Sequence, residues 1–312
     1  MLVQEQVQEH AAAAAHGAAD KFNAGEVIIH HVANSSHEEP LFRLPTILGI
    51  DFSVTKHVLM LWMVAAALFV VVTWAVQRYL KQERLIPSGV MNALEALVEF
   101  VRDDIVQPNV GRKWVGAWAP LILTLFFFIL GANAIGLIPV FDVLGLLDNF
   151  VLHTGEHSFL KQLLHGGTTA TSNFNVTAAL ATITFGAIIV AGSMAHGFVR
   201  HWLNLAPHGL AWPIYILLIP IEIMGMFVRP FALTMRLAAN MTGGHIAILA
   251  ILSFVFLFTE MAGAAAGVGV GVLSLPLGVG ISALEIIVVL VQAYVFTLLT
   301  AVFIGMAIHV HH

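Results

Sequence analysis

The chain has 312 residues, of which 59% are hydrophobic and only 10% are charged. This composition, with a mean hydropathy of +0.91, excludes a soluble globular domain and a disordered chain. The absence of cysteine excludes disulfides and cysteine metal sites, and no basic, aromatic-interleaved stretch suggests nucleic acid as a partner. We therefore expect an all-α polytopic membrane protein, with no cofactor and no metal site.

Residues 1–55 form a polar N-terminal tail. Its first ten residues carry two glutamates and no lysine or arginine, which is the reverse of a cleaved signal peptide. Its histidines follow no metal-binding spacing, so we expect a solvated, partly ordered tail to which we assign no chemistry. The membrane domain is expected to follow over residues 56–312.

The first span is expected over residues 57–77, which are 21 uncharged residues between Lys56 and Arg78. This length is enough to cross a bilayer. Residues 90–106 then show an apolar stripe opposed by charged side chains, with Ser88 placed to cap the helix. Such a helix is expected to lie on the membrane surface rather than to cross it.

Four further apolar segments are long enough to span a membrane. We expect them at residues 114–141, 176–199, 212–260 and 279–308. Between the last two, residues 263–280 read GAAAGVGVGVLSLPLGVG, and the glycines and proline favour a break that folds the last two helices into a long hairpin. Three glycines spaced four residues apart can alternatively form a small-residue packing face.

Five crossings place the two termini on opposite sides of the membrane. Residues 78–113 hold six lysines and arginines, residues 142–172 hold one, and residues 263–280 hold none. By the positive-inside rule the 78–113 connection is cytoplasmic. The N-terminus is then expected outside and the C-terminus inside.

Residues 222–245, EIMGMFVRPFALTMRLAANMTGGH, place ionisable groups inside the fourth apolar segment. A charge at the centre of a membrane helix costs about 2.5–3.5 kcal/mol. Glu222, Arg229 and Arg236 recur every seven residues, so they share one stripe of the helix. His245, nine residues beyond Arg236, faces nearly the opposite way. The helix therefore shows ionisable groups to two surroundings, and we expect two aqueous approaches to it.

Most of these groups also have a purely local interpretation. Arg229 can extend its charge towards an interface, Glu222 can pair with Arg229, and His245 can be a satisfied interior histidine. Arg236 has no acid within one turn, so a local role explains it least well. Because arginine stays protonated in proteins, Arg236 is a fixed charge and an electrostatic barrier rather than a proton relay.

The last helix carries Glu285 and Gln292 seven residues apart, on one face. Counting outward from the hairpin turn brings Glu285 to the depth of His245. The same count brings Gln292 deeper, towards Arg236. An imidazole and a carboxylate at one depth can share and pass a proton near neutral pH.

Four motifs resemble the membrane-embedded subunit a of F-type ATP synthases: MRLAANMTGGH, LEIIVVLVQAYVFTLLTAVF, NAIGLIPV and NFNVTAALA. The resemblance covers roughly residues 57–308. It implies a proton-translocating stator subunit, without a catalytic site of its own, in a bacterial inner membrane. The implied partners are a ring of c subunits and a b-type peripheral stalk, and the implied mechanism couples proton flow through two offset half-channels to rotation of the ring.

By position, Arg236 matches the family's essential arginine, Asn240 its neighbouring asparagine and Gln292 its last-helix glutamine. Many members have Glu at position 245 and His at position 285, whereas this chain has His245 and Glu285. The exchange preserves a histidine–carboxylate pair, so we keep the outer half-channel role for these two residues.

Asn173 departs from the family pattern, because some bacterial members carry an aspartate there, and its part in proton entry is left open. We assign Asn175 to the outer half-channel and Glu222 to the inner one. Two other functions stand beside this interpretation. A secondary ion transporter predicts an internal repeat that the sequence lacks, and a purely structural membrane subunit leaves Arg236 unexplained.

Overall fold

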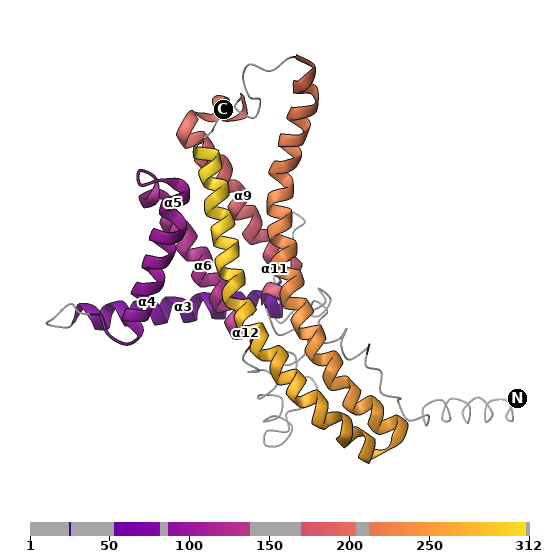
Figure 1. Cartoon of the computed structure of the whole chain (residues 1–312). Helices are drawn as coiled ribbons and strands as arrows, with labels where there is room; N and C mark the ends of the chain where they lie inside the picture. The colour runs from indigo at the N-terminus through magenta and orange to yellow at the C-terminus, as the bar shows by residue number, and fades with distance from the viewer. Residues whose placement is uncertain (1–24, 26–52, 82–86, 138–169, 204–211, 310–312) are drawn as a thin grey trace, which may run out of the picture.

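Figure 1 shows the computed structural model, which describes residue 25 and residues 53–81, 87–137, 170–203 and 212–309. In this part of the chain nearly all residues are helical, and five helices are long and apolar enough to cross a membrane. They are α3 (Lys56–Leu80), α6 (Val115–Leu137), α9 (Phe174–His196), α11 (Trp212–Ala262) and α12 (Ala264–Ile308). The predicted all-α polytopic class is confirmed. Most of the predicted N-terminal tail lies outside the described residues.

The last helix, α12, contacts each of α6, α9 and α11. Buried apolar side chains of these helices form one core, which includes Ile122, Ile129, Leu237 and Ile304. In Figure 1, α3 lies across the direction of α11 and α12, and it exposes most of its apolar side chains. Because exposed apolar surface of this extent is unusual on a soluble protein, it indicates a lipid surrounding.

The two longest helices, α11 and α12, pack against each other as an antiparallel hairpin (Figure 1). Its turn is Gly263, whose φ of +86° lies in the left-handed region that favours glycine. The predicted start of the last helix near Val279 is wrong, because α12 begins at Ala264 and Pro276 lies inside it. Within a membrane a helix satisfies its own backbone hydrogen bonds, which favours continuing the helix through glycine-rich sequence.

The glycines of this segment form a packing face as well. Gly267 and Gly271 are buried against α11. A Cβ built at Gly267 would collide with the side chain of Thr259, and one at Gly271 would touch Val255 at 3.8 Å. The small-residue face and the hairpin are therefore both present, and they are not alternatives.

The hairpin is longer than a bilayer is thick. With 51 residues, α11 is about 76 Å long, and α12, with 45 residues, is about 68 Å long. The hydrocarbon core of a bilayer is about 30 Å thick. Both helices are strongly apolar on average, so they stay within the membrane only if they incline strongly to its normal.

The predicted surface helix is a continuous amphipathic helix with a π-helical segment. It consists of α4 (Val90–Glu99), η1 (Phe100–Val106) and α5 (Gln107–Val110). Val101 and Ile105 are buried and η1 contacts α6 and α12, whereas Arg102 is exposed. The predicted cap at Ser88 is wrong: Gly89 precedes the helix with a φ of +59°, and no side chain caps it. The expected apolar side is therefore buried in η1, whereas α4 buries none of its residues.

Two other span ends differ from the expected ones by three residues. The first span was expected to end at residue 77, but α3 continues to Leu80. The third span was expected to reach residue 199, but α9 ends at His196 because Gly197 adopts a φ of +87°, and α10 (Phe198–Leu203) follows. The second span was expected to reach residue 141, and its last four residues lie outside the described ranges.

Candidate functional site

His245 of α11 and Glu285 of α12 meet inside the hairpin. Nδ1 of His245 lies 3.5 Å from Oε1 of Glu285, and the side chains are 19% and 4% exposed. His245 lies 18 residues before Gly263 and Glu285 lies 22 residues after it, so the antiparallel register brings them to nearly the same depth, as counting along the sequence predicts. The pair brings an imidazole and a carboxylate together in one contact inside the hairpin.

The second glycine of the sequence Thr-Gly-Gly-His leaves room for Glu285. A Cβ at Gly244 would lie 2.8 Å from Oε1 and 3.1 Å from Cδ of Glu285, closer than side chains normally approach. A Cβ at the preceding Gly243 would meet nothing within 4 Å. Gly244 therefore allows α12 to bring its carboxylate against the backbone of α11.

Further polar contacts border this pair. The hydroxyl of Thr242 donates to the backbone carbonyl of Ser172 at 3.4 Å, where the 3₁₀ helix η3 (Ala170–Ser172) touches α11. Next to it, the hydroxyl of Thr171 donates to Oδ1 of Asn133 at 2.5 Å, and both of these side chains are fully buried. Polar groups of α6, η3, α11 and α12 thus follow one another through an apolar interior.

Reasoning from the sequence missed Asn133, Thr171 and Thr242 as members of this network. The available signal was the motif itself, because Asn133 begins NAIGLIPV and Thr242 lies in MRLAANMTGGH. A polar side chain in the middle of an apolar helix needs a hydrogen-bond partner, since burying it without one costs roughly 1–3 kcal/mol in proteins. That requirement alone predicts a partner for Asn133, although not which one.

Asn173 and Asn175 lie at the start of α9 in different surroundings. Asn173 is 8% exposed and caps the helix, because its Oδ1 accepts a 2.8 Å hydrogen bond from the backbone N–H of Asn175. An aspartate would cap equally well, which accounts structurally for the residue type at this position. The side chain of Asn175 is exposed.

The outer surface of α11 carries Arg236. Leu233, Leu237 and Met241 are buried, whereas Arg236 and Asn240, one turn apart, are exposed. Among the described residues, no ion pair or hydrogen bond involves Arg236. Because an unpaired guanidinium in lipid is costly, this face of α11 fits a partner that brings an anion or water.

The neighbouring cation, Arg229, has partners within the chain. Its Nη2 lies 3.5 Å from Oε1 of Glu222, with side chains 30% and 45% exposed. Its guanidinium also lies over the ring of Phe303 of α12, 5.5 Å from the ring centre. Of the two interpretations open from the sequence, the structure shows the local pairing of Glu222 with Arg229.

Gln292 is buried in the hairpin at 6% exposure. Arg236 lies 27 residues before Gly263 and Gln292 lies 29 residues after it, so the two are at similar depth. In the described structure no hydrogen bond joins them. Gln292 therefore belongs to the interior of the hairpin, and Arg236 to its surface.

Histidines at the far end of α12 serve the packing of the bundle. Nε2 of His196 bonds the carbonyl of Ile308 at 2.9 Å, and Nε2 of His309 bonds the carbonyl of Val110 at 3.2 Å. Burial lowers the pKa of His201 in α10, and the nearby His196 lowers it further. Within the described ranges, no group of three or more histidine, aspartate or glutamate side chains is placed to hold a metal ion.

Comparison with known proteins identifies the family. Residues 58–305 match the family described as ATP synthase A chain. The chain is 41% identical to ATP synthase subunit a 2 of Chlorobium luteolum, over 91% of this chain and 76% of that protein. It is 39% identical to ATP synthase subunit a 2 of Prosthecochloris aestuarii, over 96% and 84%, and 35% identical to ATP synthase subunit a of Anaeromyxobacter dehalogenans, over 98% and 77%. With matches over most of its length, the chain belongs to the ATP synthase A chain family.

Proposed function

We propose that Arg236 separates two proton half-channels in this chain and faces a carboxylate of the c-subunit ring. The family is that of the membrane-embedded, proton-translocating subunit a of F-type ATP synthases, which is a proton-channel subunit rather than a catalytic one. The observation that carries the proposal is an exposed arginine on a membrane helix, with no partner among the described residues.

The charge of Arg236 determines what a ring carboxylate does. A ring carboxylate that faces lipid has no counter-charge nearby, so an ionised form would be costly. It therefore stays protonated while it faces lipid. Beside Arg236 the ionised form gains a two-toothed, charge-assisted contact, so the carboxylate releases its proton. Because the guanidinium does not give up its own proton, Arg236 blocks direct passage from one half-channel to the other.

The outer half-channel is assigned to His245 and Glu285. Their contact of 3.5 Å gives a proton two acceptors inside the hairpin. Asn175 is exposed at the start of α9, next to the segment that touches Thr242. Asn173 supports this route by capping the helix.

The inner half-channel is assigned to Glu222. It lies 14 residues before Arg236, about 21 Å along α11 and on the far side of Arg236 from His245. Its carboxylate is 45% exposed and paired with Arg229, so it can accept protons from water without an isolated charge in the membrane. Asn240 and Gln292 complete the assignment as the residues closest to the level of Arg236.

The proposed setting is a bacterial inner membrane with the N-terminus outside and a b-type peripheral stalk as a further partner. The six basic residues of 78–113 support this orientation. Cysteines introduced as Ser36→Cys and Asn92→Cys are expected to react with membrane-impermeant reagents from opposite sides. Labelling of both from one side would reject the orientation.

The ring-facing surface is tested by photo-crosslinking. The chain has no cysteine, so Asn240→Cys and Val70→Cys each place one photoreactive label, and both positions are exposed, on α11 and α3 respectively. In the assembled complex we expect c-subunit adducts from Asn240→Cys and few from Val70→Cys. Absence of c-subunit adducts from Asn240→Cys would reject the proposed contact and favour a transporter that works without a ring.

A further inference from the structure

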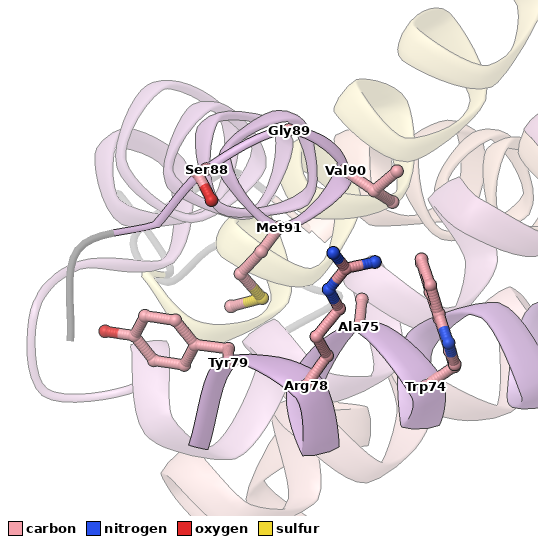
Figure 2. A pocket seen from close by; sticks show the side chains of 8 residues that line it. All are labelled: Trp74, Ala75, Arg78, Tyr79, Ser88, Gly89, Val90 and Met91. Carbon is pink, nitrogen blue, oxygen red and sulfur yellow. The ribbon is translucent and has the colours of Figure 1, made fainter. Parts of the chain in front are cut away.

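A cavity lies outside the proton path, between the end of α3 and the start of α4 (Figure 2). Its volume is about 240 Å³. Residues from both helices line it, among them Trp74, Arg78, Tyr79, Ser88 and Met91. None of these residues belongs to the site around Arg236, so the cavity needs an explanation of its own.

The cavity is lined by a positively charged side chain, Arg78, that forms no ion pair with a carboxylate of the described residues. Figure 2 shows the guanidinium of Arg78 reaching from α3 into the space in front of Val90 of α4. The indole of Trp74 holds it at 5.4 Å from the ring centre. Within the described part of the chain, no carboxylate pairs with Arg78. The guanidinium therefore lies against Trp74 at the edge of the cavity, and no carboxylate of the described residues neutralises it.

The cavity lies where α3 meets the membrane surface. Phe69 and Val70, two turns earlier, are 72% and 62% exposed, as expected for side chains in lipid. Trp74 and Tyr79 follow, then Lys81, which is the order of aromatic and basic residues at a membrane–water interface. An anion that reaches Arg78 from this side comes from the headgroup layer.

We propose that this cavity binds the phosphate group of an anionic phospholipid. The guanidinium of Arg78 can hold two phosphate oxygens at once. The exposed Ser88 and the first turn of α4, which no side chain caps, add hydrogen-bond donors on the opposite wall. A lipid fits better than free phosphate, because the cavity also has apolar walls and opens beside the lipid-exposed surface of α3. The bound headgroup joins α3 to α4.

Lipid retention by the whole complex tests this proposal. Complexes with the wild-type chain, Arg78→Gln or Lys81→Gln are placed in nanodiscs of phosphatidylcholine with a minority of phosphatidylglycerol. Phosphatidylglycerol that survives a detergent wash is then counted by native mass spectrometry. Lys81 is the matched control, because it is exposed near Arg78 at the same end of α3 but does not line the cavity.

We expect Arg78→Gln to lower phosphatidylglycerol retention about fivefold, Lys81→Gln to leave it nearly unchanged, and millimolar inorganic phosphate to have no effect. Equal losses in the two variants would show a general surface-charge effect and overturn the site. Displacement by inorganic phosphate would overturn the assignment to a lipid. A second variant, Met91→Trp, fills the cavity and keeps Arg78, so unchanged retention in that complex would also overturn the proposal.

Discussion

Arg229 and Arg236 lie seven residues apart on one stripe of α11, yet their surroundings differ. Arg229 pairs with Glu222 and lies over Phe303. Arg236 is exposed and has no partner among the described residues. The two arginines share one stripe of the helix, but Arg229 is held by contacts within the chain, whereas Arg236 is an unpaired charge among the described residues. The contacts around a membrane charge, and not its spacing, distinguish the two.

The largest effect is expected when each of the two arginines is replaced by lysine, because only one of the two replacements should abolish activity. Arg236→Lys is expected to reduce ATP synthesis by the reconstituted complex to background, because a desolvated ammonium can lose its proton and cannot hold a carboxylate in two places. Arg229→Lys is expected to keep most activity, since a lysine can still pair with Glu222. Synthesis is measured under an imposed proton gradient. Similar losses at both positions would remove the proposed distinction.

The next largest effect is expected for proton pumping when the contact between His245 and Glu285 is changed. His245→Ala is expected to lower ATP-driven proton pumping at least about tenfold, because a positioned proton-transfer group is removed. The double exchange His245→Glu with Glu285→His is expected to recover much of the pumping, since it keeps one imidazole and one carboxylate in the same contact. Dye-monitored acidification of proteoliposomes measures both. An exchanged protein no better than the worse single variant would refute the pair.

A smaller loss of proton pumping is expected from a substitution that only displaces the side chain of Glu285. Gly244→Ala places a Cβ 2.8 Å from Oε1 of Glu285. The carboxylate is then forced from its rotamer at a cost of about 1 kcal/mol, which corresponds to about fivefold slower pumping. Gly243→Ala is the matched control, because its Cβ meets nothing within 4 Å. Equal rates in the two variants would mean that the close approach of Glu285 is unimportant.

The packing of the hairpin is tested by stability rather than activity. Gly267→Ala inserts a methyl group against Thr259 and is expected to destabilise the hairpin by about 1–3 kcal/mol. Gly269→Ala lies in the same helix with nothing within 4 Å of its Cβ, so it is expected to have little effect or to stabilise slightly. Thermal unfolding of the detergent-solubilised complex compares them. A Gly267→Ala protein as stable as the control would contradict the small-residue face.

The smallest effect separates the two roles open to Asn173. If it only caps α9, Asn173→Ala costs about 1 kcal/mol of stability and Asn173→Ser costs almost nothing. Pumping is then expected to be normal in Asn173→Ser. Loss of pumping in the serine variant at unchanged stability would assign Asn173 to the proton path itself.

The sequence predicted the contact of His245 with Glu285 because an antiparallel hairpin fixes the register of its two helices. The position of the turn matters, because moving it by one residue lengthens the count to one partner and shortens the count to the other; with the turn at Gly263 the counts are 18 and 22 residues. Such counting needs no knowledge of the remaining helices. The contact between His245 and Glu285 is therefore the part of the candidate site that can be predicted from the sequence.

Other features depend on contacts that no local pattern contains. The glycine-rich sequence 264–280 is compatible with a loop or with a packed helix, and burial against α11 decides for the helix. Phe303, beneath Arg229, comes from a helix more than seventy residues away in sequence. The bond between Asn133 and Thr171 also joins segments that are 38 residues apart. Spacing rules describe one helix at a time, so they predict none of these pairs.

Passive proton flow through the Arg236→Ala complex shows directly whether Arg236 is the barrier between the half-channels. In proteoliposomes with an imposed gradient, a pH-sensitive dye reports conduction while ATP formation is measured in parallel. ATP formation is expected to be lost while conduction persists or rises, because ring carboxylates can then pass position 236 still protonated. Coupled ATP synthesis at the wild-type rate in this complex would contradict the assignment of Arg236 as the barrier between the half-channels.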